Sequence, residues 1–149
     1  MNIDLQTKNI VKTKLEQRGN EYKIKAPVTG SVVLNNAVVA SFGDGSLLFF
    51  GLNQKPFEVK AHKGVILTMS SNGQFVYTGG DDGKFLKISS DGQINEIYNF
   101  GSQWVDCVAS TENYFACSSG KKAYLWVKDD SKPLICLLYT SDAADDRIC

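Results

Sequence analysis

Short apolar runs alternate with small polar turns along most of the chain. The runs are about four to six residues long, are rich in Val, Ile, Phe, Tyr and Thr, and are bounded by Gly, Asp, Ser and Asn. Such runs are typical of β-strands joined by tight turns. The repeating part of the chain lacks the 3.6-residue periodicity of an amphipathic helix. The pattern therefore predicts an all-β fold.

The strand pattern repeats at a spacing of 38 residues. Three segments, at 38–50, 76–88 and 114–126, align without gaps, and each has an apolar stretch, small residues, a glycine turn and a second apolar stretch. Further strand-like pieces flank each segment, so one period holds about four strands. Four strands in roughly 40 residues are typical of one blade of a β-propeller. We therefore expect about three four-stranded antiparallel blades.

The gapless alignment assigns equivalent positions in the three hairpins. In the first strands of the three hairpins, the equivalent residues are Val38, Val76 and Tyr114. In the second strands, they are Phe50, Ile88 and Trp126.

The segment "AHKGVILTMSSNGQFVYTGGDDGKFLKIS" resembles the repeat unit of the WD-repeat propeller family. It has Ala61-His62 in place of a Gly-His dipeptide, an Asn-Gly turn, a strand of small residues, and the Asp82-Gly83 turn before the closing strand. The resemblance extends over residues 21–135. It implies an intracellular propeller that acts as a rigid platform for protein partners, without catalysis and without a cofactor.

The resemblance also implies a structural role for several polar residues. In the family, a His, a Ser or Thr, an Asp and a Trp can form a hydrogen-bonded tetrad inside a blade. His62 and Asp82 match the first and third members, whereas Gly79 stands at the hydroxyl position and Ile88 at the Trp position. We therefore expect degenerate blades held mainly by apolar packing.

Family strand order places an outer strand at each end of the repeating region. Residues 21–25 are expected to form an outer strand that closes the ring on the last blade, and residues 132–135 to begin the outer strand that follows the third unit. Residues 1–20 are a lead-in with no predicted structure. Because propellers usually have four to eight blades, we expect residues 21–135 to be part of a larger ring.

The C-terminal stretch, residues 136–149, looks foreign to the repeat. Residues 136–145 match one reading frame of a transposase-type sequencing-library adaptor without a mismatch. We therefore interpret this tail as non-native and assign no function to it.

Two aspartates occupy the same turn in consecutive units. Asp44 and Asp82 each precede a glycine between the two strands of a hairpin. Asp accepts backbone hydrogen bonds in such turns and Gly allows positive φ, so the repeat favours a structural role over a metal or acid–base site. Asp81 has no acidic counterpart in the other units, and we expect it to be an exposed charge on a binding face.

One end of the blades is the candidate partner-binding surface. Trp104 opens the innermost strand of the third unit, and aromatic residues are favoured anchors of protein interfaces. Packing between blades is the alternative role for Trp104. We combine Trp104 with Lys63, Asp106 and Asp81 as the predicted partner-binding residues.

Composition narrows the function further. Hydrophobic residues make up 43% of the chain and the formal net charge is zero, which suits a globular core and gives no reason to expect a nucleic-acid partner. The apolar runs are too short to span a membrane, and the N-terminus lacks the apolar region of a secretory signal. The four cysteines form no CxxC pair and His62 is the sole histidine, so no zinc site is predicted. These features favour a cytoplasmic protein.

The functional prediction is thus a non-catalytic protein-interaction scaffold. The alternative is a propeller enzyme or small-ligand binder whose site lies in blades outside this sequence. Such a site needs inward-pointing acids, arginines or histidines from several blades.

Overall fold

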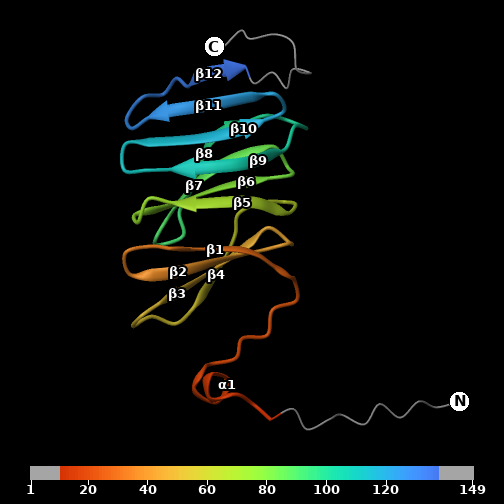
Figure 1. Ribbon diagram of the computed structural model, residues 1–149, viewed down its shortest axis with the longest axis vertical. Coiled ribbons are helices and arrows are strands. Elements are labelled where there is room, and N and C mark those ends of the chain that lie inside the picture. Colours follow the sequence, from red (N-terminus) through yellow and green to blue (C-terminus); the bar gives the residue numbers. More distant parts are fainter. Residues whose placement is uncertain (1–10, 138–149) are drawn as a thin grey trace, which may run out of the picture.

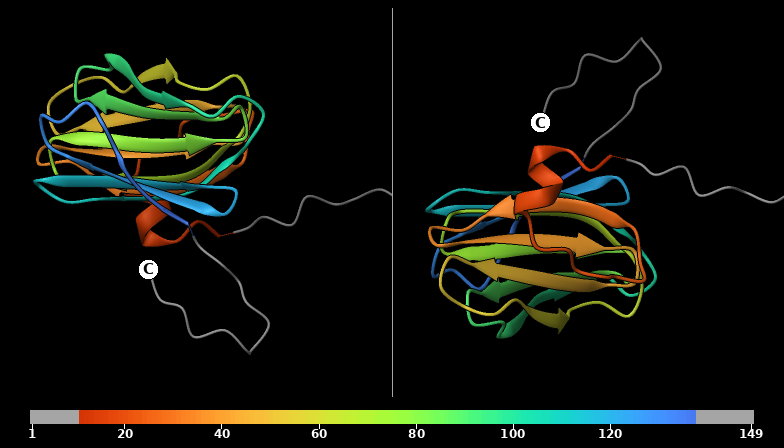
Figure 2. Two further views of the ribbon diagram at one scale, coloured as in Figure 1. Left: turned by 90° about the horizontal axis from the view of Figure 1, so that it is seen from above. Right: turned by 90° about the horizontal axis from the view of Figure 1, so that it is seen from below.

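The chain forms three four-stranded antiparallel sheets, as the repeat predicts. A computed structural model describes residues 11–137, and the sheets follow one another along its long axis (Figure 1). The views along that axis show the sheets as successive layers, one over the next (Figure 2). Each sheet takes its four strands in chain order, so every pair of neighbouring strands is joined by a short connection.

The strand bounds follow the three repeat units. The first sheet contains β1 (Val28–Val33), β2 (Ala37–Phe42), β3 (Ser46–Gly51) and β4 (Phe57–Lys60). The second contains β5 (Ile66–Ser71), β6 (Phe75–Gly80), β7 (Lys84–Ser89) and β8 (Ile94–Asn99). The third contains β9 (Val105–Ser110), β10 (Tyr114–Ser119), β11 (Lys122–Val127) and β12 (Leu134–Leu137).

A short helix precedes the sheets. Helix α1 (Lys14–Arg18) begins after Thr13, whose hydroxyl accepts a hydrogen bond from the Glu16 N–H while the Glu16 carboxylate accepts one from the Thr13 N–H. This reciprocal capping satisfies donors that a helix start otherwise leaves free. None of the residues of α1 is buried.

Apolar packing between successive sheets forms two cores. Between the first and second sheets lie eight buried residues: Leu34, Val39, Leu47, Phe49, Ile66, Val76, Leu86 and Ile88. Between the second and third sheets the buried cluster is mainly aromatic: Tyr77, Phe85, Val105, Cys117, Tyr124 and Trp126. The second sheet contributes side chains to both cores, whereas the first and third sheets each contribute to one. Stacked sheets exclude water from their apolar side chains in this way.

The gapless alignment is wrong by one residue in the third unit. Val38 pairs with Phe50 and Val76 with Ile88, as the alignment requires, but Trp126 pairs with Phe115 instead of Tyr114. The reason is a shorter turn, because β10 and β11 pair up to Ser119 and Lys122 and leave only two residues between them. Phe115 is therefore the counterpart of Val76.

The expected outer strand at residues 21–25 is absent. This segment has no strand structure, and the Tyr22 ring instead packs edge-on against Phe50 of β3, with ring centroids 5.6 Å apart. None of the described strands pairs with the segment, so its backbone lacks the hydrogen-bonded partner that a strand needs. The outer strand predicted to begin at 132–135 does form, as β12, with bounds that reach Leu137. The predicted foreign tail otherwise lies outside the described residues.

Candidate functional site

Turns and loops from all three sheets meet at one end of the blades, which we call the rim. It comprises residues 43–45, 61–65, 81–83, 100–104 and 120–121. Each loop that enters a sheet lies against the turn of the preceding sheet: the N–H groups of Ala61 and His62 both donate to the Gly45 carbonyl at 3.0 Å, and the Phe100 N–H donates to Gly83 at 2.8 Å. Consecutive blades are therefore joined at the rim by backbone hydrogen bonds.

His62 is the centre of a buried polar chain in the second sheet. Its Nδ1 lies 2.9 Å from Asp82 Oδ1, and its Nε2 lies 2.8 Å from the Thr78 hydroxyl. His62 and Thr78 are 1% and 0% exposed, so the bond between them is shielded from water, whereas the bond to Asp82 is part-buried. Because both ring nitrogens have partners, the desolvation of this imidazole is compensated.

Asp82 ties the entry loop to the hairpin turn. Its carboxylate accepts from the backbone N–H groups of Lys63 and Lys84 at 3.1 and 3.2 Å, in addition to His62. Burial alone would raise the pKa of Asp82, but the hydrogen bond with His62 and the two backbone donors outweigh it. The pKa therefore lies below its ordinary value of 3.8, and the carboxylate stays ionised.

The structure corrects the sequence assignment of the hydroxyl. Thr78, one residue before the predicted position at Gly79, supplies the hydroxyl that bonds His62. Gly79 has a different task, because a Cβ there would lie 2.5 Å from Val105 Cγ1 and 2.6 Å from the Val105 carbonyl oxygen. The absence of a side chain thus lets β9 approach β6. Alternation of side chains along β6 was the signal that could have distinguished the two residues.

Asp44 occupies the equivalent turn in the first sheet. Its Oδ1 accepts from the Ser46 N–H at 3.1 Å and from the Ser46 hydroxyl at 2.7 Å. The hydrogen bond from the Ser46 hydroxyl is the largest cause of a lowered Asp44 pKa, and the bond from the Ser46 N–H lowers it further. Asp44 and Asp82 share the same bond to the N–H two residues ahead, which is the geometry of an Asx turn.

Asp81 differs from its expected role as an exposed charge. It is half-buried, and its Oδ1 accepts from the Val65 N–H at 2.8 Å while its own N–H donates to the Val65 carbonyl. The Asp81 carboxylate therefore fixes the start of β5 from within the protein.

The other three predicted contact residues are exposed at the rim end. Trp104 is 61% exposed, directly before β9, and Lys63 lies exposed in the loop before β5. Asp106 is exposed on β9, where it accepts from the Ser118 hydroxyl at 2.7 Å. Among the described residues, no hydrogen bond, ion pair or cation–π contact joins these three side chains to one another.

Trp104 contrasts with the aromatic residues of the second core. Phe85, Phe115, Tyr124 and Trp126 contact one another in the second core, with ring centroids between 5.4 and 6.3 Å apart. Trp104 has no such ring contact in the described part of the chain.

Within residues 11–137, no group of three His, Cys, Asp or Glu side chains is arranged to hold a metal ion, and no helix is long and apolar enough to cross a bilayer.

Solved WD40 structures have the same arrangement of blades. The structure of U3-55K matches with a TM-score of 0.69 and 13% identity, over 80% of this chain and 42% of that one. The WD40 repeats of RRP9 match with a TM-score of 0.69 and 14% identity, over 81% and 41%. The WD40 β-propeller domain of Doa1 matches with a TM-score of 0.62 and 11% identity, over 80% and 44%.

These similarities define the fold. The chain has the fold of part of a WD40 β-propeller, and it spans about two fifths of the length of the WD40 structures it matches. No family model and no curated protein matches the sequence.

Proposed function

We propose that the chain is a non-catalytic, cytoplasmic protein-interaction module that binds a partner protein through Trp104 and Lys63 at the rim. It would form part of a larger propeller, and neither a cofactor nor nucleic acid nor a membrane would be its target. The single observation that carries the proposal is the 61% exposure of the Trp104 ring, directly before Val105, which is buried in the second core. A large ring left in water loses the benefit of burial unless a partner covers it.

The rigidity of the rim supports this role. The loop that carries Lys63 is held by Asp82 through the Lys63 N–H and by Asp81 through the Val65 N–H. A fixed backbone lowers the conformational entropy that is lost when a surface binds its partner. The two carboxylates of the turn between β6 and β7 thus support the loop from which the Lys63 side chain projects.

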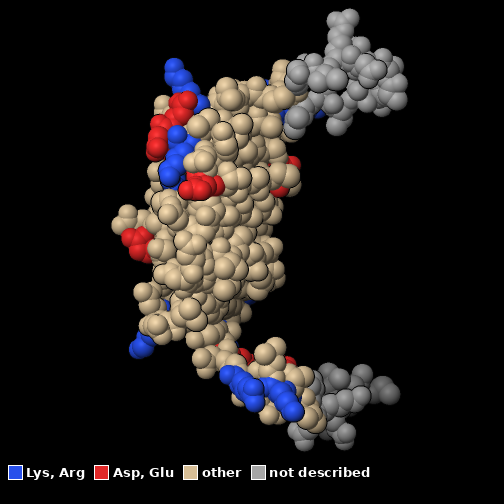
Figure 3. Space-filling model, turned by 60° about the vertical axis from the view of Figure 1, so that its left-hand side comes forward, with Lys and Arg blue, Asp and Glu red and all other residues tan. Residues whose placement is uncertain are grey.

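Two further observations favour a scaffold. His62, the sole histidine of the chain, is 1% exposed and its hydroxyl partner Thr78 is 0% exposed, so a substrate cannot reach the hydroxyl or the imidazole. On the face drawn in Figure 3, positive side chains gather near the end that carries α1, whereas over the sheets positive and negative side chains lie near one another. On that face, such a mixed surface suits a protein partner better than a polyanion.

An affinity capture with matched variants tests the proposal. Bait proteins are the full chain, Trp104→Ala, and Tyr114→Ala as the control, because Tyr114 is an aromatic residue 49% exposed at the opposite end of its hairpin. We expect a protein that is retained by the full chain and by Tyr114→Ala and is lost from Trp104→Ala. Equal retention by all three baits would contradict the role of Trp104.

A further inference from the structure

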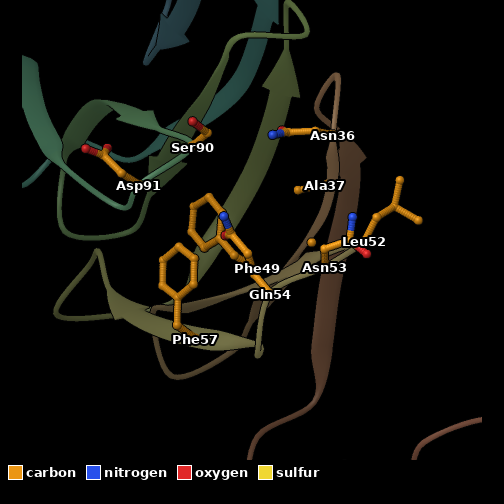
Figure 4. Close-up of a pocket in the computed structure, with 10 residues that line it drawn as sticks. Asn36, Ala37, Phe49, Leu52, Asn53, Gln54, Phe57, Ser90 and Asp91 are labelled. Atoms are coloured by element: carbon orange, nitrogen blue, oxygen red, sulfur yellow. The ribbon is translucent and has the colours of Figure 1, made fainter.

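A second candidate site lies at the end of the blades opposite the rim. It is a cavity of about 570 Å³ between the first two sheets, which we call the lower cleft. This volume is within the usual range of ligand sites in proteins. Figure 4 shows Ser90 and Asp91 on one side, Asn36 and Asn53 on the other, and the rings of Phe49 and Phe57 between them.

The floor of the lower cleft is apolar and fixed. Phe49 and Phe57 are cross-strand neighbours on β3 and β4, and their rings stack with centroids 4.8 Å apart and planes 6° apart. Phe49 is 1% exposed, whereas Phe57 is partly exposed and can meet a ligand. The turn at Gly92 lies against the same ring, because a Cβ there would stand 3.0 Å from Phe57 Cε2.

One wall of the lower cleft carries the Asp91 carboxylate, which hydrogen bonds orient. Asp91 Oδ1 accepts from the Ser89 hydroxyl and, at 3.4 Å, from the Gln93 N–H. The hydrogen bond from Ser89 is the largest cause of a lowered Asp91 pKa, and the bond from the Gln93 N–H lowers it further. Among the described residues Asp91 has no cationic partner, and Oδ2 has no hydrogen bond. The free oxygen is thus available to an incoming cation.

The opposite wall offers amide groups. Asn36, Asn53 and Gln54 line the lower cleft, and none of their side chains makes a hydrogen bond to another described residue. Carboxamides provide a donor and an acceptor side by side, which matches the N–H and C=O of a peptide backbone. An aromatic floor accommodates the apolar stem of a long basic side chain.

We propose that the lower cleft binds an extended peptide segment that carries an arginine or lysine. The amides of Asn36, Asn53 and Gln54 contact the peptide backbone, Asp91 pairs with the basic head, and Phe57 contacts its stem. This site shares no residue with the rim, so its test is independent of the proposed function.

A peptide titration of the full 149-residue chain tests the proposal. The probe is the blocked pentapeptide Gly-Ala-Arg-Ala-Gly, the charge control has Glu in place of Arg, and the readout is the backbone and side-chain amide resonances. We expect the Arg peptide to shift the Asn36, Asn53 and Gln54 side-chain resonances, and the Glu peptide to leave them in place. Absence of any shift with the Arg peptide would overturn the proposal.

Variants separate a built site from general charge attraction. Asp91→Asn keeps an oxygen for Ser89 and removes the charge, so we expect about two- to fivefold weaker binding. The matched control is Asp130→Asn, because Asp130 also accepts from the N–H two residues ahead in the corresponding loop of the third sheet. Asn53→Lys places a positive charge at the lower cleft without touching the Asp91 turn and must also weaken binding. Equal losses of affinity in Asp91→Asn and Asp130→Asn would contradict the proposal. Unchanged binding in Asp91→Asn or in Asn53→Lys would also contradict it. Trp104→Ala lies outside the lower cleft and must bind the Arg peptide normally.

Discussion

Asp82 is hydrogen-bonded to His62 at 2.9 Å, so the turn between β6 and β7 is fixed to the loop that leads into β5. The same imidazole reaches Thr78 on β6, which places three polar side chains in one buried chain. This chain holds the part of the rim from which Lys63 projects. The contribution of this chain to the free energy of unfolding can therefore be measured without any partner, separately from binding at the rim.

Removal of the Thr78 hydroxyl isolates one bond of this chain. Thr78→Val keeps the shape of the side chain and leaves His62 Nε2 without its partner, so we expect unfolding to become easier by about 1–3 kcal/mol. Urea unfolding followed by circular dichroism measures the change. Thr68→Val is the control, because the half-buried Thr68 makes no side-chain hydrogen bond to a described residue. Equal losses in the two variants would show that the hydroxyl bond contributes nothing.

Acid should weaken the same chain through Asp82. Because the pKa of Asp82 is below 3.8 in the folded protein, the ionised group stabilises the fold above that pH. The contribution is lost as the pH falls through the folded-state pKa. We expect the difference in urea midpoint between the protein and Asp82→Asn to be full at about pH 7 and to shrink below about pH 3.8. A difference that stays constant down to about pH 2 would contradict this assignment.

Gly79 should tolerate no side chain. Gly79→Ala forces a Cβ against the backbone of Val105, and we expect a loss of about 1–3 kcal/mol from overpacking between β6 and β9. Gly51→Ala is the matched control in another strand, because its Cβ would meet the Gln54 side chain at an ordinary 3.5 Å. Chemical denaturation of both variants measures the difference. Similar stability of Gly79→Ala and Gly51→Ala would show that the second and third sheets can move apart at Gly79 without loss of stability.

Cysteine labelling should report on the second core. Burial raises the pKa of the Cys117 thiol to about 12, whereas Cys107 is exposed on β9. Since the thiolate is the reactive form, iodoacetamide should modify Cys107 promptly and Cys117 only after unfolding. Peptide mass mapping over time measures both rates. Prompt labelling of Cys117 under native conditions would contradict the packing of β10 against the second sheet.

Much of the fold was predictable because its determinants are local. Turn residues and apolar alternation marked the hairpins of all three sheets, and the fixed spacing gave their repetition. The one-residue error in the third hairpin arose because loop length sets the register, and the turn at Gly120 is shorter than its counterparts. Residues 21–25 were predicted to be a strand from the strand order of the family, yet a strand also needs a neighbouring strand edge, which the sequence does not reveal.

The candidate site was less predictable because its geometry depends on contacts between distant segments. The sequence indicated that His62 and Asp82 act together, but the identity of the hydroxyl partner depends on which side chains of β6 face the imidazole. Asp81 read as a free surface charge because its bond to the Val65 N–H depends on how the entry loop lies beside the turn. The lower cleft has no sequence signature, since its two walls come from different blades.

Site-specific photocrosslinking from the rim tests directly whether the rim is the protein-binding surface. A photoreactive benzoylphenylalanine is placed at position 104 in one protein and at position 114 in another, and both are irradiated in cell extract. We expect one discrete adduct with a partner protein from position 104 and none of that mass from position 114. The same adduct from both positions, or an adduct from position 114 alone, would contradict the assignment of the rim as the protein-binding surface.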